Sequence, residues 1–331
     1  MLAVIALAAI GVLVVAADWQ DIRRSLSEAD WELTLIALVF ITAAYLCLSY
    51  RFVAINRLFD IRMKRHELFR IGYVSIALNK IVASLGVAGH SLRVMLMQPR
   101  GVATGKVLAA SLCHSHFYNL VIFCLLPLGL IYLLINGSVS KGAILGLGLT
   151  VAALITVLII GTMMVFMRSL RISVLRIINA ISRLVIRRDI SSFLNSFDEA
   201  MTIGVSAVKE QPSALVMPLV LTAAEWIFTV VALWFCSDAV GSPLSMGVLF
   251  TGLAVGVPLG SISMIPGGLG IQEASMSGVY VLLGVSFEQA ILVSILFRVI
   301  YSFIPFAISL LLYRRLLQSS ETSIYEGQAD D

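Results

Sequence analysis

Long apolar segments recur along the whole of this 331-residue sequence, and they constrain its fold more than any other feature. A membrane hydrocarbon core of about 30 Å takes roughly 20 apolar residues of helix. Because hydrocarbon offers backbone groups no hydrogen-bond partner, such segments must be helical. The expected spans are 2–17, 31–50, 67–87, 107–135, 142–167, 214–236, 245–263 and 287–313, with a short apolar helix at 271–285. The sequence therefore predicts an all-α polytopic membrane protein with about 7–9 membrane helices, some of them re-entrant or broken.

Composition excludes other classes of protein. Hydrophobic residues make up 60% of the chain and charged residues only 13%, against about 25% charged residues in soluble domains. The basic residues lie in short segments beside apolar spans, which argues against nucleic-acid binding. The four cysteines lie singly within apolar stretches and lack the paired spacing of a zinc site or a disulfide framework. The sequence predicts no metal site and no cofactor.

Lysine and arginine in the loops predict the orientation, because cytoplasmic loops of membrane proteins are enriched in them. Residues 51–70 and 168–213 are rich in both, and Arg314 and Arg315 follow the last span. We expect these segments on the cytoplasmic side, with both termini, in the inner membrane of a prokaryote. The loops that are poor in basic residues are expected outside, namely 18–30, 136–141 and 237–244.

The longest polar interval, residues 168–213, is expected to be a cytoplasmic linker. Apolar residues recur at helical spacing between Leu170 and Ile186, with arginines interleaved. Such a helix either lies in the membrane interface and attracts anionic lipid or is an ordinary basic linker. The acidic tail, 318–331, is expected to be disordered, which leaves residues 1–317 as one transmembrane domain.

The apolar segment 67–87 lies between two basic segments, 51–70 and 88–106, which are both expected in the cytoplasm. We therefore predict that it enters the membrane and returns on the same side. Polar and small residues suit such a hairpin better than a straight span. Asn79 and Lys80 lie near its middle, and Gly86 and Gly89 lie near its end.

A second interruption lies between Ser263 and Glu273. Proline removes a helical hydrogen-bond donor, and glycine permits positive φ angles and close backbone approach. Non-helical backbone at membrane depth is tolerated only where protein or a water-filled cavity covers it. Glu273 is expected in the first turn of the next helix, where the helix dipole favours a carboxylate. The alternative is a glycine-capped turn at the membrane surface. The residues of the break are Pro266, Gly267, Gly268 and Gly270.

The two interrupted regions are similar in order. Residues 67–135 and 245–313 each contain a glycine-rich break, then a charged residue, then a long span with a proline. This order predicts an internal repeat of the kind that frames transporter sites. Chance similarity between apolar sequences is the alternative.

Ionisable residues inside membrane spans are costly, at least about 2.5 kcal/mol near the centre, so each suggests a function. The candidates for substrate binding and translocation share a place inside or beside a span: Lys80, Arg93, Glu225, Glu273 and Arg298, with Asn79 beside them. Together with two broken helices they predict a polar cavity. A structural ion pair, joining Arg298 to Glu225 or Glu273, is the alternative for any one of them.

His114 and His116 are candidates for the wall of this cavity. Residues two apart on a helix point about 200° apart, so the two imidazoles do not chelate one metal ion. The sequence also contains no nucleophile elbow, P-loop or dinucleotide fingerprint. No catalytic residue is predicted.

The run from Ile265 to Glu273 (IPGGLGIQE), with Glu225-Trp226 before it and Leu296-Phe297-Arg298 after it, resembles the lysylphosphatidylglycerol synthase transmembrane region family. Members are also called flippase-like domain proteins, and the resemblance covers nearly the whole chain. It implies movement of a lipid between leaflets. In the best-known members the lipid is aminoacylated phosphatidylglycerol, made by a fused synthase domain. Other relatives are associated with polyprenyl-linked sugars or hopanoids.

The sequence departs from the family pattern in its first half. Arg93, Glu273 and Arg298 match it, but His90 stands where relatives tend to have an acidic residue. Likewise, His114-Ser115-His116 and Asn119 stand where relatives tend toward Glu-Arg and then Asp. The lipid headgroup is therefore expected to differ from the familiar one. The chain ends shortly after the last span, so no fused synthase is expected.

These features predict a lipid translocase, without enzymatic activity, that moves a phospholipid or a polyprenyl- or hopanoid-type lipid. The expected partners are anionic or phosphate-bearing lipids and a separate lipid-synthesising enzyme. Arg93 and Arg298 are expected to attract the phosphate, because the guanidinium is planar and offers several donors. One alternative is an integral-membrane lipid-modifying transferase with His114 or His116 as base. Another is an assembly partner of a membrane enzyme.

Overall fold

The computed structural model describes residues 29–82, 87–137, 141–185, 187, 189–263 and 265–328. The first expected span, 2–17, and Gly86 lie outside these residues. The described chain forms helices and no strands, and this confirms the all-α class. The helices are α3 (Trp31–Leu58), α4 (Arg65–Ile81), α5 (Val87–Met97), η1 (Gln98–Arg100), α6 (Thr104–Asn136), α7 (Lys141–Phe166), α8 (Arg168–Val185), α9 (Ser191–Glu210), η2 (Pro212–Leu215), α10 (Val216–Ala239), α11 (Met246–Ile262), η3 (Pro266–Gly268), α12 (Ile271–Leu282), α13 (Phe287–Arg298), η4 (Val299–Phe303) and α14 (Ile304–Gln328).

The expected number of membrane helices, 7–9, is not confirmed. Among the described residues, four helical segments are long and apolar enough to cross a bilayer, or five if the bent pair α7–α8 counts as one. The four are Trp31–Leu58, Thr104–Asn136, Pro212–Ala239 and Phe287–Leu316. Of the other expected spans that the structure describes, 67–87 and 245–263 form helices of only 17 residues each, α4 and α11. The expected short helix at 271–285 is α12, which has 12 residues, or about 18 Å at about 1.5 Å per residue.

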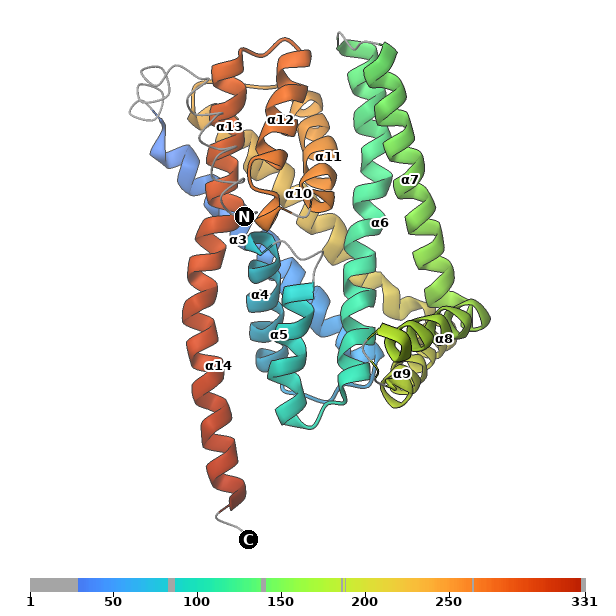
Figure 1. Cartoon of the computed structure of the whole chain (residues 1–331). Coiled ribbons are helices and arrows are strands. Elements are labelled where there is room, and N and C mark those ends of the chain that lie inside the picture. Colours follow the sequence, from blue (N-terminus) through green and yellow to red (C-terminus); the bar gives the residue numbers. More distant parts are fainter. Residues whose placement is uncertain are drawn as a thin grey trace.

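Two helical hairpins approach the middle of the molecule from opposite ends (Figure 1). In the first, α4 packs on α5 and both open ends lie at the lower end of the view. In the second, α11 packs on α12 and the open ends lie at the upper end. The tips meet: a Cβ placed on Gly267 would lie 2.7 Å from the Lys80 carbonyl oxygen. Re-entry of 67–87 into a membrane stays a prediction, but its hairpin geometry is present.

The basic segments gather at the lower end of the molecule. Lys106 donates to the Asp60 carbonyl oxygen (2.8 Å), and Arg100 donates to the Leu316 carbonyl oxygen (3.2 Å). The helices α8 and α9 lie at this end too, where α9 packs on the start of α6. One expectation is wrong: Arg51 does not belong to a loop, because α3 continues to Leu58 and buries it completely.

Labelling from each side of the membrane tests this arrangement. In a background without the native cysteines, we expect cysteines at His66 and Gln98 to react with an impermeant maleimide from the cytoplasmic side. These two exposed residues lie at the open end of the first hairpin. A cysteine at exposed Ser286, at the open end of the second, should react only from outside. If His66 and Gln98 react from opposite sides, the hairpin does not re-enter.

The break before α12 depends on glycine. Gly267, Gly268 and Gly270 have φ angles of 60°, 64° and 81°, a region that other residues rarely adopt. At Gly268 a Cβ would also lie 2.6 Å from the Gly260 carbonyl oxygen. Glu273 lies in the first turn of α12, as expected, and its Oε2 accepts from the Gly270 amide (2.7 Å). The carboxylate thus accepts from a backbone N–H at the N-terminal end of α12, where the break removes the usual helical partners.

Buried apolar side chains form two clusters with a polar layer between them. One cluster includes Leu48 on α3 and Ile122 on α6, and the other includes Phe52 on α3. Arg51 and His114, both buried, belong to the layer. A buried charge is costly without a partner, and Arg51 in this layer pairs with the buried Glu225.

The tail was expected to be disordered from residue 318. In the structure α14 continues through Gln328, and 329–331 lie outside the described residues. An existing helix supplies the nucleus for further turns, so polar residues can extend it.

Candidate functional site

A cavity of about 240 Å³ lies where the hairpin tips meet beside α6. Its polar lining comes from α3, α4, α5, α6, α11, α12, α13 and η4. These residues are Arg51, Asn79, Lys80, Arg93, His114, Ser115, Tyr118, Asn119, Ser261, Gln272, Arg298 and Tyr301. The structure thus brings most of the expected site residues together, although Glu225 and Glu273 reach the cavity only through their arginine partners.

The cavity reaches the side of the molecule at about mid-height. Three of its lining residues, Val82, Asn119 and Ser261, are exposed. Asn119 lies near the middle of α6, which is one of the helices long enough to cross a bilayer. An opening at this height faces the side of the helix bundle rather than either end.

Arg51 and Glu225 form a fully buried ion pair across α3 and α10. The Arg51 Nη1 lies 2.9 Å from Glu225 Oε2 and 2.9 Å from the Thr222 hydroxyl. The two side chains are 0% and 1% exposed. The sequence reasoning missed Arg51, although the apolar run that continues through Phe52 and Val53 could have indicated a residue inside a span.

Arg298 is held by the broken helix. Its Nε lies 3.1 Å from Glu273 Oε1, and its Nη1 donates to Gln272 Oε1 at 2.8 Å. Its Nη2 donates to the Gly267 carbonyl oxygen. Of the alternatives that the sequence left open, the ion pair with Glu273 is present and the pair with Glu225 is not. Arg298 therefore supports the break, and its charge is already matched.

Lys80 lies between two aromatic rings at the tip of the first hairpin. Its Nζ donates to the hydroxyls of Tyr118 (3.0 Å) and Tyr301. It also lies 4.7 Å and 4.3 Å from the centroids of the same rings, within the range of cation–π attraction. No carboxylate among the described residues pairs with it. The sequence reasoning did not identify these tyrosines, which lie 38 and 221 residues from Lys80.

A π-helical turn positions Tyr301. Pro305 has no N–H, so the Tyr301 carbonyl loses its usual helical donor. The buried Tyr45 hydroxyl donates to that carbonyl instead, at 2.9 Å. The wider turn, η4, follows Arg298 directly, and such turns are frequent at functional sites.

Arg93 is a buried guanidinium without a carboxylate. It is 1% exposed, its Nε donates to the Ser75 hydroxyl at 2.8 Å, and its Cζ lies 4.4 Å from the Phe52 ring centroid. Its Nη1 has no hydrogen-bond partner within the described residues. Since a buried charge is stable only with compensation, an anion in the cavity that Arg93 lines would stabilise this guanidinium.

The charges around the cavity do not balance. Arg51 is matched by Glu225 and Arg298 by Glu273, while Lys80 and Arg93 have no acidic partner in the described chain. The lining of the cavity therefore carries an excess of positive charge. Such a site favours a ligand with a negative charge, for which arginine offers a bidentate fork.

Residues 1–309 match the model of the lysylphosphatidylglycerol synthase TM region. The chain belongs to this family. Among the curated relatives are the phosphatidylglycerol lysyltransferases of Staphylococcus aureus strains COL, N315 and MW2. Each is 29% identical over 107 residues, which is 32% of this chain and 13% of the relative. The match thus takes in a small part of the length of these relatives.

In this member of the family, Asn79 joins the two helices of the first hairpin. Its Oδ1 accepts from the Gly89 amide at 2.7 Å, and a Cβ on Gly89 would lie 2.4 Å from the Asn79 side chain. His90 follows and lies 3.0 Å from the Ser115 hydroxyl. His90, where the family resemblance led us to expect an acidic residue, thus lies beside the cavity wall.

The two neighbouring histidines face different cavities. His114 lines the central cavity, is buried, and lies 3.4 Å from the Leu48 carbonyl oxygen through Nε2. His116 lines a second cavity of about 180 Å³ and lies 3.1 Å from the Thr162 hydroxyl. No group of three or more His, Cys, Asp or Glu side chains that could hold a metal lies within the described part of this family member.

Proposed function

We propose that this chain is a membrane lipid translocase that moves a phosphate-bearing lipid between leaflets. The observation that carries the proposal is the central cavity, which has two unmatched cations and an opening at mid-height. A headgroup in the cavity would lose contact with bulk water and gain contact with Lys80 and Arg93. The acyl chains of the same lipid would stay in the bilayer beside α6. Membership of a lipid-related membrane family supports the same conclusion.

Arg93 and Lys80 would bind the phosphate. The unpartnered Arg93 Nη1 supplies a charge-assisted donor, and Lys80 supplies a point charge that Tyr118 and Tyr301 hold in place. Arg298, which the sequence suggested for this role, would act through Glu273 by keeping the broken helix in shape. The Arg51–Glu225 pair would similarly join α3 to α10.

The opposed hairpins suggest how both leaflets reach one site. The first hairpin and α6 extend over residues 65–136, which nearly coincides with 67–135, and the second hairpin with α13 and the start of α14 falls within 245–313. Because the hairpins approach from opposite ends, the expected repeat would be an inverted one, as in many transporters. Small movements of the two tips would then open the cavity toward one leaflet or the other.

A reconstituted assay tests the function. In vesicles containing the purified protein, a phospholipid with a fluorescent headgroup-linked reporter should become accessible to a membrane-impermeant quencher faster than in empty vesicles. Mass spectrometry should find the lipid unchanged. A new lipid species formed with a soluble donor would overturn the proposal in favour of a transferase. Translocation no faster than in empty vesicles, with folded protein present, would leave the assembly partner as the better explanation.

A further inference from the structure

Helix α8 turns sharply away from α7. The helical segments Val151–Phe166 and Arg168–Leu184 are bent by 103° at a one-residue break. If α7 runs across the membrane, a helix at this angle lies close to the membrane plane. Figure 1 places α8 at the end of the molecule where the basic segments gather.

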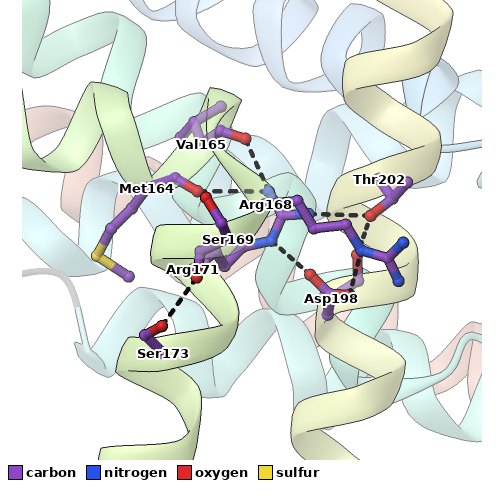
Figure 2. Close-up of polar contacts among 8 residues, drawn as sticks. All are labelled: Met164, Val165, Arg168, Ser169, Arg171, Ser173, Asp198 and Thr202. Carbon is purple, nitrogen blue, oxygen red and sulfur yellow. Dashed lines mark hydrogen bonds and ion pairs between the residues drawn. The ribbon is translucent and has the colours of Figure 1, made fainter.

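A buried arginine fixes this corner (Figure 2). Arg171, which is 2% exposed, donates from Nη1 to the Val165 carbonyl oxygen (2.8 Å) at the end of α7. From Nε and Nη2 it donates to Asp198 (2.7 Å) and Thr202 (2.9 Å) on α9. One side chain thus satisfies a helix-end carbonyl and joins three helices. The direction of α8 is therefore built into the fold.

The residues of α8 divide into three faces at 100° per residue. One face packs on the protein and contains the buried Arg171, Leu175 and Ser182. A second, charged face contains exposed Arg176 and Arg183. The third face is apolar, lies nearly opposite the charged one, and is exposed. Its members are Ile177 (59% exposed), Ile178 (41%), Ile181 (54%) and Leu184 (81%).

The charge of α8 has one sign. The helix contains four arginines and no acidic residue, and the first carboxylate after it, Asp189, pairs with Arg183 at 2.5 Å. An apolar face opposite an arginine face is the pattern of helices that lie in a membrane interface and attract anionic lipids. A helix that served only as a basic linker would have no reason to expose four large aliphatic side chains.

We propose that α8 lies in the plane of the cytoplasmic membrane surface, with its apolar face among the acyl chains and the exposed Arg176 and Arg183 at anionic headgroups. The bilayer is the one occupant that explains both the 103° bend and the opposite positions of the two exposed faces. This surface is separate from the central cavity, so the inference does not depend on translocation.

Spin labels in the full-length protein test the inference. In a background without native cysteines, labels are placed at Ile181 on the apolar face and at Arg176 on the charged face, and the protein is reconstituted into vesicles. We expect the Ile181 label to collide strongly with dissolved oxygen and weakly with a water-soluble nickel complex, and the Arg176 label to show the reverse. Equal access of both labels to nickel would overturn the membrane position. Protection of Ile181 from both reagents would overturn it too, because protein would then cover that face.

Varying the lipid composition tests whether the exposed arginines of α8 favour anionic lipid. The Ile181 label should lie deeper in vesicles that contain phosphatidylglycerol than in pure phosphatidylcholine, and Arg176→Gln/Arg183→Gln should remove the difference. The matched control, Arg62→Gln/Lys64→Gln, removes two exposed charges outside α8 and should preserve it. A depth that is the same in both lipids for the unaltered chain would overturn the preference for anionic lipid.

Discussion

Replacing Arg93 with glutamine is expected to slow lipid translocation by roughly ten- to a hundredfold while the protein stays folded. Hydrogen bonds to charged groups contribute about 1.5–3 kcal/mol, which corresponds to that range of rates or affinities. Arg93 has no acidic partner among the described residues, so its removal leaves no buried carboxylate unmatched. Initial rates in the vesicle assay, with thermal unfolding in detergent, measure both effects.

Two companion variants make this result specific. Arg93→Lys keeps the charge but loses the bidentate fork, so it should retain part of the activity. Arg62→Gln, which removes an arginine that is 88% exposed at the end where the basic segments gather, should translocate lipid at the rate of the unaltered chain. If Arg93→Gln is as active as this control, Arg93 does not bind the headgroup.

Replacing Glu225 with leucine is expected to destabilise the protein by about 3–5 kcal/mol, because it leaves the Arg51 guanidinium buried without a counter-charge. Arg51 is 0% exposed, and among the described residues the Thr222 hydroxyl is its one remaining hydrogen-bond partner. The double variant Arg51→Met/Glu225→Leu should recover most of that loss, since buried ion pairs are often replaceable by apolar residues of similar size. Unfolding of each variant in the same detergent provides the comparison.

For the ion pair between Arg298 and Glu273, we expect a double apolar replacement to recover much less stability. Arg298→Met/Glu273→Leu removes not only the pair but also the donors to Gly267 and Gln272 and the cap on the Gly270 amide. The break before α12 would lose three backbone and side-chain contacts that no apolar residue replaces. We therefore expect little recovery in this double variant. Recovery equal to that of the Arg51–Glu225 double variant would show that the break holds its shape without them.

Several features were predictable from the sequence because they depend on local chemistry. Apolar runs dictate helices in hydrocarbon, and glycine and proline dictate where those helices stop, so the break at 266–270 and the first-turn position of Glu273 follow from residue types alone. Ionisable residues within apolar runs likewise predicted a buried polar site. The first half of the chain was harder, because Arg51 follows 20 residues of apolar helix and has the same local signature as a loop arginine.

Which buried side chains pair with one another depended on the tertiary structure. The sequence left Arg298 with a choice of two glutamates, and only the fold set Glu273 within 3.1 Å of it and Arg51 within 2.9 Å of Glu225. Lys80 meets Tyr301 across 221 residues because the hairpin tips converge, which no helical period encodes. The sequence by itself determined that this is a helical membrane protein with charges buried at two breaks. The tertiary structure decided which of those charges are neutralised, because neutralisation depends on distances between helices rather than on spacing along one.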